Sequence, residues 1–204
     1  MAASAKCLDN AGWRGINPGV NAQPTLQTER LFLRPLTPAD APAIARLAGR
    51  REIADTTIAI PHPYSVEQAR QWIAGNVGMF DKGKFVVFGM DLKGERTLAG
   101  TIGLREIDSE HSQAELGFWV AVECWRRGYA TEAAVAVVNF GFQQLGLNRI
   151  YAHHMIRNPA SGRVLAKIGM KREGLLRQRV RKWGVFEDVV ALAVLRTEWT
   201  SPTA

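Results

Sequence analysis

The segment from residue 113 to residue 145 constrains the fold of this chain more than any other part of the sequence. Its first eight residues, 113–120, are mostly apolar or aromatic, which is typical of a buried strand. After a short basic stretch, apolar residues recur at the spacing of one helix face, at Ala134, Val137, Val138, Gly141, Phe142 and Leu145. Residues 149–156 then predict a second strand. A strand, a helix and a strand in this order predict a right-handed crossover between two parallel strands.

The loop between the first predicted strand and the helix has the chemistry of an anion site. Gly128 permits φ > 0 or a close approach of a ligand to the backbone, and Ala130 is too small to obstruct that ligand. The free N–H groups at the start of a helix favour a phosphate or pyrophosphate, and Arg126 and Arg127 add positive charge. The alternative is an ordinary strand-to-helix turn with two solvated arginines. This segment alone does not decide between them.

The remaining sequence predicts further elements around this unit. Strands are expected at 31–33, 85–90, 97–107 and 188–195, with another strand through the alternating Arg177, Arg179 and Arg181. Helices are expected after Thr37, at the capping-box sequence 65–68 and after Asn158, while 51–63 is expected to be a surface loop. Consecutive strands joined by short turns must be antiparallel neighbours. We therefore predict an α+β fold with a mixed, twisted sheet flanked by helices.

These patterns indicate one domain at residues 28–199. Residues 1–27 contain several glycines and prolines without periodicity, which predicts a poorly ordered N-terminal extension, and 200–204 form a C-terminal tail. A chain of 204 residues with 47% hydrophobic residues is long enough to bury a normal core.

The bulk chemistry narrows the class of protein. No apolar run approaches the roughly 20 residues that span a bilayer, and Cys7 and Cys124 are too few for a disulfide framework. We therefore expect a cytoplasmic protein with no membrane partner. The net charge of +7 favours attraction to polyanions such as nucleotides, RNA or acidic proteins, although no specific nucleic acid is expected. Monomer and homodimer both remain open.

Four ordered segments carry a family resemblance. Residues 125–130, Trp-Arg-Arg-Gly-Tyr-Ala, are similar to the pattern Gln/Arg-x-x-Gly-x-Gly/Ala, with Trp in the first position and Ala in the last. Residues 158–170 are similar to Asn-x-x-Ser followed by Leu-x-Lys-x-Gly-Phe, and residues 29–35 and 188–199 also match. The chain thus resembles the GNAT acetyltransferases over nearly its whole length. The resemblance is to the branch that includes the ribosomal-protein N-terminal (alanine or serine) acetyltransferases.

The resemblance implies acetyl-CoA as co-substrate. No metal is expected, because His153 and His154 lie mid-strand and point to opposite faces, so they cannot chelate one ion together. In the family, the strand before the pyrophosphate loop and the strand after its helix splay apart, usually at a bulge, and pantetheine lies between them. Gly117 is the expected bulge residue here. The residues assigned to the cofactor are Phe118, Trp119 and Val120 on the strand edge, Arg126, Arg127, Gly128, Tyr129, Ala130 and Thr131 in the loop, and Asn158.

The resemblance also suggests the catalytic groups. Glu115 is expected to be the general base that deprotonates the incoming ammonium, with burial raising its pKa toward neutrality. The alternative for Glu115 is an exposed carboxylate or one paired with an arginine. Leu165 stands where many family members carry a tyrosine acid, so Ser161 is expected to contact the leaving sulfur. A plain helix-terminus role for Ser161 is about equally consistent.

The function implied is acetyl transfer to a primary amine by direct attack in a ternary complex. A protein N-terminal amine, with the ribosome as a possible partner, is the first expectation. A small amine, an amino acid or an antibiotic is the alternative acceptor. The alternative from another class is a non-catalytic basic binding module that keeps the fold and docks on RNA.

Overall fold

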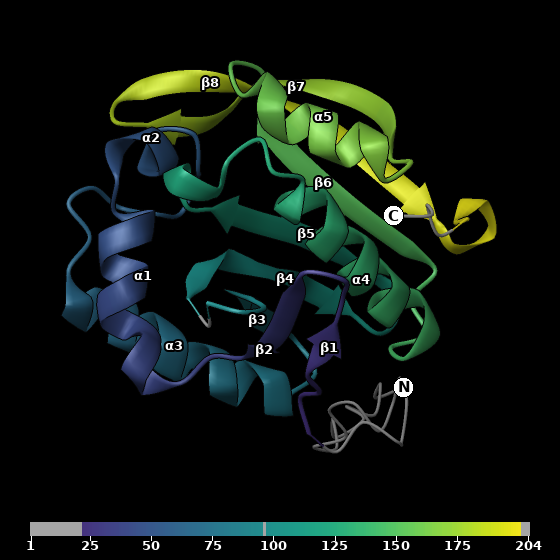
Figure 1. Cartoon of the computed structure of the whole chain (residues 1–204). Coiled ribbons are helices and arrows are strands. Elements are labelled where there is room, and N and C mark those ends of the chain that lie inside the picture. Colours follow the sequence, from purple (N-terminus) through teal and green to yellow (C-terminus); the bar gives the residue numbers. More distant parts are fainter. Residues whose placement is uncertain (1–21, 96, 201–204) are drawn as a thin grey trace, which may run out of the picture.

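The structure is a computed structural model that describes residues 22–95 and 97–200. Within these residues, one mixed sheet has the strand order β1-β2-β3-β4-β5-β6-β8-β7 (Figure 1). The strands are β1 (Leu26–Gln27), β2 (Leu31–Pro35), β3 (Val86–Leu92), β4 (Leu98–Asp108), β5 (Gln113–Val120), β6 (Arg149–Met155), β7 (Lys171–Lys182) and β8 (Val185–Leu195). The helices are α1 (Ala41–Ala48), α2 (Arg51–Ala54), α3 (Val66–Asp81), α4 (Tyr129–Gln143) and α5 (Pro159–Lys167). Most of the expected N-terminal extension and tail, residues 1–21 and 201–204, lies outside the described part.

The predicted connectivity of the sheet is confirmed. Strands β3, β4 and β5 are antiparallel neighbours, and β5 and β6 are parallel strands joined by α4. Strand β1 falls inside the segment expected to be an extension, because Leu26 pairs with Leu33 of β2. The sheet therefore begins before the expected domain boundary at residue 28.

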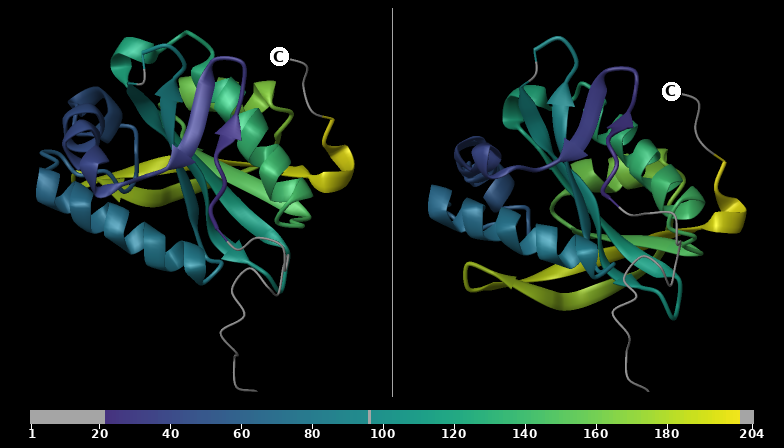
Figure 2. Two further views of the ribbon diagram at one scale, coloured as in Figure 1. Left: turned by 60° about the horizontal axis from the view of Figure 1, so that its bottom comes forward. Right: turned by 90° about the horizontal axis from the view of Figure 1, so that it is seen from below.

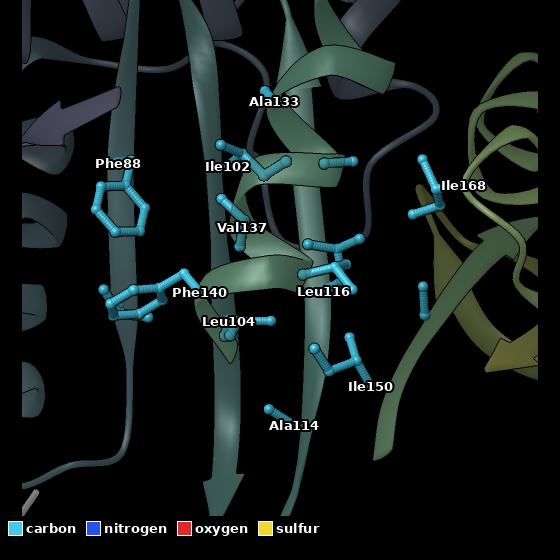
Figure 3. Close-up of a cluster of buried hydrophobic side chains, with 14 of the residues drawn as sticks. Phe88, Ile102, Leu104, Ala114, Leu116, Ala133, Val137, Phe140, Ile150 and Ile168 are labelled. Atoms are coloured by element: carbon cyan, nitrogen blue, oxygen red, sulfur yellow. The ribbon is translucent and has the colours of Figure 1, made fainter. Parts of the chain in front are cut away.

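The sheet has one layer of helices on each face. Figure 2 shows α3 and α4 on opposite sides of the strands. The α4 face carries the larger core, in which Phe140 meets Phe88 of β3 edge to face at a centroid distance of 5.7 Å (Figure 3). A Cβ at Gly141 would lie 2.8 Å from Cδ1 of Ile150, so the glycine lets α4 approach β6 closely. The opposite face carries a smaller core with α1 and α3, into which Trp119 of β5 packs.

The predicted caps at Ser65 and Asn158 are confirmed, whereas Thr37 precedes a 3₁₀ turn, Pro38–Asp40, and α1 begins after it at Ala41. The side chain of Ser65 accepts a hydrogen bond from the Gln68 N–H at 3.1 Å, and Gln68 Oε1 accepts one from the Ser65 N–H at 2.9 Å. This capping box opens α3, which continues through Gly75 and Gly78 to Asp81. The prediction of a loop throughout 51–63 is wrong at its start, because Arg51–Ala54 form the short helix α2, whose Ile53 and Ala54 are buried.

Candidate active site

A pocket opens where β5 and β6 separate. The two strands pair only at residues 113–115 of β5 with 149–151 of β6. Beyond that point β5 continues to pair with β4 as far as Val120, and β6 continues to pair with β8 as far as Met155. The strands therefore diverge, as Figure 1 shows, and the pocket between them has a volume of about 220 Å³.

The prediction that a bulge at Gly117 causes this separation is wrong. Gly117 pairs with Gly103 within an uninterrupted register from Gly100 to Arg105 of β4. The register shifts instead after Arg105, next to Glu106, which has φ of +52°. Each strand keeps its other neighbour along its length, β4 for β5 and β8 for β6, so the pairing that ends after Glu115 is the one between β5 and β6.

The residues of the predicted pyrophosphate loop form the tight strand-to-helix turn that the sequence predicts. Gly128 is the N-cap of α4 with φ of +83°, a left-handed conformation that favours glycine. Arg126 also has a positive φ, of +62°. Arg126, Arg127 and Gly128 are exposed, and no side chain in the described part of the chain caps the first turn of α4. The N–H groups at this helix start are therefore accessible to an anion.

Arg30 of the β1–β2 turn braces this loop, a role that the sequence analysis missed. Its Nη1 donates a hydrogen bond to the Arg127 carbonyl at 2.9 Å, and its guanidinium lies 4.8 Å from the centre of the Tyr129 ring. Its Nε donates to Glu132 in the first turn of α4 at 2.7 Å. The loop conformation thus depends on a residue nearly 100 positions away in the sequence.

Only part of the predicted β5 edge is free. The Val120 carbonyl accepts a hydrogen bond from the Trp125 indole N–H at 2.7 Å, which ties the loop to the end of β5. The Ala121 N–H bonds to the Ala99 carbonyl on the β4 side. Because these bonds alternate in direction along an antiparallel strand, the backbone of Trp119 faces β4 and that of Phe118 faces the pocket. Phe118 is therefore the edge residue best placed to pair with a ligand.

Asn158 and Ser161 are brought together at the start of α5. Asn158 is the N-cap, and its Oδ1 accepts a hydrogen bond from the Ser161 N–H at 3.3 Å. Its Nδ2 donates to Ser161 Oγ at 3.0 Å. The hydroxyl oxygen accepts this bond, so the O–H of Ser161 remains able to donate. Both residues line the pocket, as does Leu165.

Glu115 is buried and ion-paired. Arg105 of β4 donates two hydrogen bonds to its carboxylate, at 3.0 Å and 2.7 Å, and His153 Nδ1 lies 3.1 Å from Oε1. Its side chain is 6% exposed. Burial by itself raises the pKa of Glu115, but the hydrogen bonds from His153 and Arg105 outweigh burial and hold the pKa below its ordinary value. The prediction of a raised pKa is wrong, because pairing with an arginine, the alternative interpretation, is what the structure shows.

Arg105 and His153 lie between Glu115 and the pocket. Both line the pocket, whereas Glu115 does not. The His153 side chain is 25% exposed, and its ring meets Tyr151 at a centroid distance of 5.6 Å. Burial and a hydrogen bond to Glu106 raise the pKa of Tyr151 to about 12, so its phenol stays protonated. The titratable side chains that line the α1–α3 side of the pocket thus include Arg105, His153 and Tyr64, and the Glu115 carboxylate is bonded to the first two.

The sequence analysis did not assign Arg105 or His153 to the site. Only the strand register places these two residues near Glu115. Arg105 of β4 is opposite Glu115, and Tyr151, two positions before His153 on β6, is paired with Glu115 on the other side. Pairing across a crossover of more than 30 residues cannot be read from sequence periodicity. His154, the other histidine of β6, lies on the opposite side of the strand, where a Cβ at Gly162 of α5 would be 2.7 Å from its Nε2.

Other chemistry finds no support in the described residues. Burial raises the pKa of the Cys124 thiol, which disfavours a thiolate nucleophile beside the loop. Residues 22–95 and 97–200 contain no cluster of three or more histidine, cysteine, aspartate or glutamate side chains that could hold a metal ion. None of the helices described there is long and apolar enough to cross a membrane.

Comparison with known proteins agrees with this geometry. The family model described as acetyltransferase (GNAT) domain matches residues 30–171. The chain is 34% identical over 173 residues to the uncharacterized N-acetyltransferase YoaA of Bacillus subtilis, covering 85% of this chain and 97% of that protein. It is 29% identical over 125 residues to the ribosomal-protein-serine acetyltransferase of Escherichia coli, covering 61% and 69% of the two chains. A GNAT-family acetyltransferase structure from Bacillus anthracis superposes with a TM-score of 0.76 at 28% identity, covering 86% of this chain and 100% of that one.

The family match spans well over half of the chain, and it includes the splayed strands, the glycine loop and the start of α5. The solved relative superposes over 86% of this chain, which includes most of the mixed sheet. The chain therefore belongs to the GNAT acetyltransferase family and is an N-acetyltransferase.

Proposed function

We propose that the protein transfers the acetyl group of acetyl-CoA to the amine at a protein N-terminus, by direct attack in a ternary complex. The observation that carries this proposal is the pocket between the separated strands β5 and β6. Its lining comes from both faces of the sheet. Leu165 and Ser161 of α5 line one side, and Ile44 of α1 and Trp72 of α3 line the other. Two substrates can therefore meet between the strands from opposite sides.

Acetyl-CoA occupies the α4–α5 side in this proposal. Its pyrophosphate binds the N–H groups of residues 126–131, and Arg126 and Arg127 supply charge. The free backbone groups of Phe118 pair with a pantetheine amide and bind the thioester oxygen as it becomes negative. Ser161, held by Asn158, donates its hydroxyl hydrogen toward the departing sulfur.

The acceptor amine enters on the α1–α3 side, where the lining is apolar or neutral apart from the guanidinium of Arg105, which is paired with Glu115. Thr56, Thr57 and Tyr64 supply hydroxyl groups, and the pocket-lining residues within the described chain include no aspartate or glutamate. A polyamine carries further ammonium groups that need carboxylates, so this lining disfavours polyamines. A peptide N-terminus carries one ammonium followed by neutral backbone. The likeness to the Escherichia coli ribosomal-protein-serine acetyltransferase supports a protein acceptor.

Glu115 belongs to the proton path of this reaction, because the carboxylate is linked to the pocket through His153. A protein N-terminus of the ribosomal type is an acceptor found in the cytoplasm, and we place the enzyme there. A small amine or amino acid remains the second acceptor class, because the threonine and tyrosine hydroxyls that line this side also suit a small polar molecule.

Release of coenzyme A in the presence of acetyl-CoA and a panel of amines tests the proposal. The panel contains peptides that begin with alanine or serine, the same peptides with a blocked N-terminus, free amino acids and spermidine. We expect the unblocked peptides to give the highest kcat/KM, with one acetyl group at the N-terminus by mass spectrometry. Faster acetylation of spermidine or of a free amino acid would overturn the peptide acceptor. Coenzyme A release at the rate of blank hydrolysis with every amine would favour the binding-module alternative.

A further inference from the structure

His153 lines the acceptor side of the pocket and is hydrogen-bonded to the buried Glu115 carboxylate behind it. We propose that His153 accepts the proton of the attacking amine at its Nε2 atom, and that Glu115 is a positioning residue that acts through His153. This inference rests on the proposed function and assigns a catalytic residue to it. It changes the role of Glu115 from direct base to orienting carboxylate.

The first argument is the position of Glu115. Its side chain is 6% exposed and does not line the pocket, and both carboxylate oxygens already accept hydrogen bonds from Arg105. A carboxylate that is ionised and bidentate with a guanidinium is a weak proton acceptor. An amine in the pocket meets Arg105 and His153 before it reaches Glu115.

The second argument is the tautomer of His153. An ionised carboxylate can only accept hydrogen bonds, so the 3.1 Å contact with Glu115 requires a proton on Nδ1. The lone pair of the neutral ring is then on Nε2. Among the residues that the structure describes, none bonds to Nε2, and the ring lines the pocket. This is the arrangement in which a carboxylate fixes the tautomer of an imidazole base.

The third argument is the electrostatic setting of the ring. The charged and titratable groups around His153 are Glu115 on β5, Arg105 on β4, Tyr151 on its own strand and Glu173 on β7, which is in turn paired with Arg149. Glu115 is the group in hydrogen-bond contact, so a proton arriving on Nε2 is stabilised by an adjacent negative charge. Arg105 opposes this effect and keeps the carboxylate ionised.

The proton balance is complete without a further reagent. An ammonium acceptor gives one proton to Nε2 of His153, and the neutral amine attacks the carbonyl carbon of the thioester. Collapse of the tetrahedral intermediate breaks the carbon–sulfur bond, and the thiolate takes the electron pair. The second proton leaves the nitrogen and neutralises the thiolate, with Ser161 donating a hydrogen bond to the sulfur. The proton on His153 returns to solvent through the exposed part of the ring.

The test compares wild type with His153→Gln, Glu115→Gln and the control His111→Gln. His111 is an exposed histidine in the β4–β5 turn, outside the pocket. With an alanine-initiated peptide as acceptor, we expect His153→Gln to lower kcat about 10²- to 10⁴-fold, the usual range for a lost general base. The KM for acetyl-CoA should stay within about two-fold. The acid limb of the pH–rate profile should disappear, and His111→Gln should match wild type.

Glu115→Gln separates a positioning role from a structural one. The amide keeps the shape but lacks the negative charge, so the acid limb should move to lower pH together with a fall in kcat. Imidazole added to His153→Ala should restore part of the rate, and it should not accelerate Glu115→Gln. A purely structural role for Glu115 would change stability and leave the position of the acid limb where it is in wild type.

Two results would overturn the assignment of His153 as the base and Glu115 as its positioning residue. If His153→Gln keeps at least half of the wild-type kcat and the same acid limb, then His153 is not the base, and Glu115 or water takes that role. A ¹⁵N spectrum of the wild-type protein in which the neutral His153 ring carries its proton on Nε2 would contradict the proposed tautomer. This measurement does not depend on a variant folding. A wild-type enzyme that acetylates no amine at all would instead overturn the proposed function, and the base assignment would fall with it.

Discussion

The two sides of the pocket between β5 and β6 are built in different ways. The α4–α5 side uses backbone groups and one cap within two contiguous segments, 125–131 and 158–161. The α1–α3 side uses side chains from three strands, in which Arg105, Glu115 and His153 meet through register alone. The first side is thus fixed by local conformation and the second by long-range pairing. Substitutions on the first side should act mainly on cofactor affinity, and those on the second on proton transfer and stability.

The largest effect on the α4–α5 side is expected for Gly128→Val. The residue has φ of +83°, and a Cβ there would lie 3.2 Å from Arg30 Nη2, so valine must strain or move the loop. A side chain held in the left-handed region costs about 1–3 kcal/mol. If the loop relaxes to avoid that strain, coenzyme A should bind roughly 10- to 100-fold more weakly by calorimetry.

Gly184→Val is the matched control for Gly128→Val. Gly184 has a similar φ of +87°, in the turn between β7 and β8, where an added Cβ meets no atom of the described residues within 4 Å. It should lower stability through the same backbone strain and leave coenzyme A affinity unchanged. Equal loss of affinity in both variants would mean that the loop is not the pyrophosphate site.

Arg105→Met should have the largest effect on stability on the α1–α3 side. It leaves the buried Glu115 carboxylate with His153 as its remaining partner, and breaking such a pair costs about 1–3 kcal/mol when one partner is partly exposed. Arg149→Met, which breaks the surface pair with Glu173, is the control and should cost less than about 1 kcal/mol. Urea unfolding of both variants measures the difference. A smaller loss for Arg105→Met than for the control would contradict the strength assigned to the Arg105–Glu115 pair.

Arg105→Met should also change how the stability of the protein depends on pH. The pKa of Glu115 is lower in the folded protein than the ordinary value of 4.5, so its stabilisation is fully present above pH 4.5 and is lost as the pH falls through the lower folded value. Removing Arg105 raises the folded pKa and reduces that stabilisation. The stability gap between wild type and Arg105→Met should therefore narrow below about pH 4.5. A gap that stays constant from pH 7 to pH 3 would mean that Arg105 acts by packing alone.

A smaller effect is expected for Ser161→Ala. In the proposed reaction Ser161 donates one hydrogen bond to the leaving sulfur, and its loss is worth about 0.5–1.5 kcal/mol, which corresponds to roughly a two- to ten-fold fall in kcat. The alkaline limb of the pH–rate profile should change if the hydroxyl protonates the sulfur. Asn158→Ala serves as the comparison, because it removes the helix cap at a cost of about 1 kcal/mol of stability. Lower stability with normal turnover in Ser161→Ala would reduce that residue to a helix-terminus contact.

The smallest effect is expected for Arg30→Leu. The variant loses the hydrogen bond to the Arg127 carbonyl and the contacts with Glu132, but the arginine side chain is 44% exposed and such partly solvated contacts are weak. Coenzyme A affinity should fall about two- to five-fold. Arg70→Leu, on the exposed face of α3, removes one guanidinium and should leave affinity unchanged. Equal effects of both variants would indicate a general charge effect instead of a brace.

The sequence determined the local parts of this protein. The helical period of 134–145, the caps at Ser65 and Asn158, and Gly128 at a helix start each depend on residues a few positions apart, and the structure confirms them. The parallel pair β5–β6 also followed from the sequence, because a crossover helix leaves the second strand no other direction.

Tertiary structure alone decided which side chains face one another across strands. Gly117 predicted a bulge, but the register of β5 with β4 is uninterrupted there, and the strands separate where the pairing of β5 with β6 ends after Glu115. Glu115 was expected to have a raised pKa, which its burial alone would give, but Arg105 and His153 reverse the shift. The physical reason is that the alternation of residues along a strand shows which face of the sheet a side chain is on. Which residue lies beside it depends on the register between strands, and here the partners are 10 to 40 positions apart in the sequence. That register is set by packing of the whole sheet.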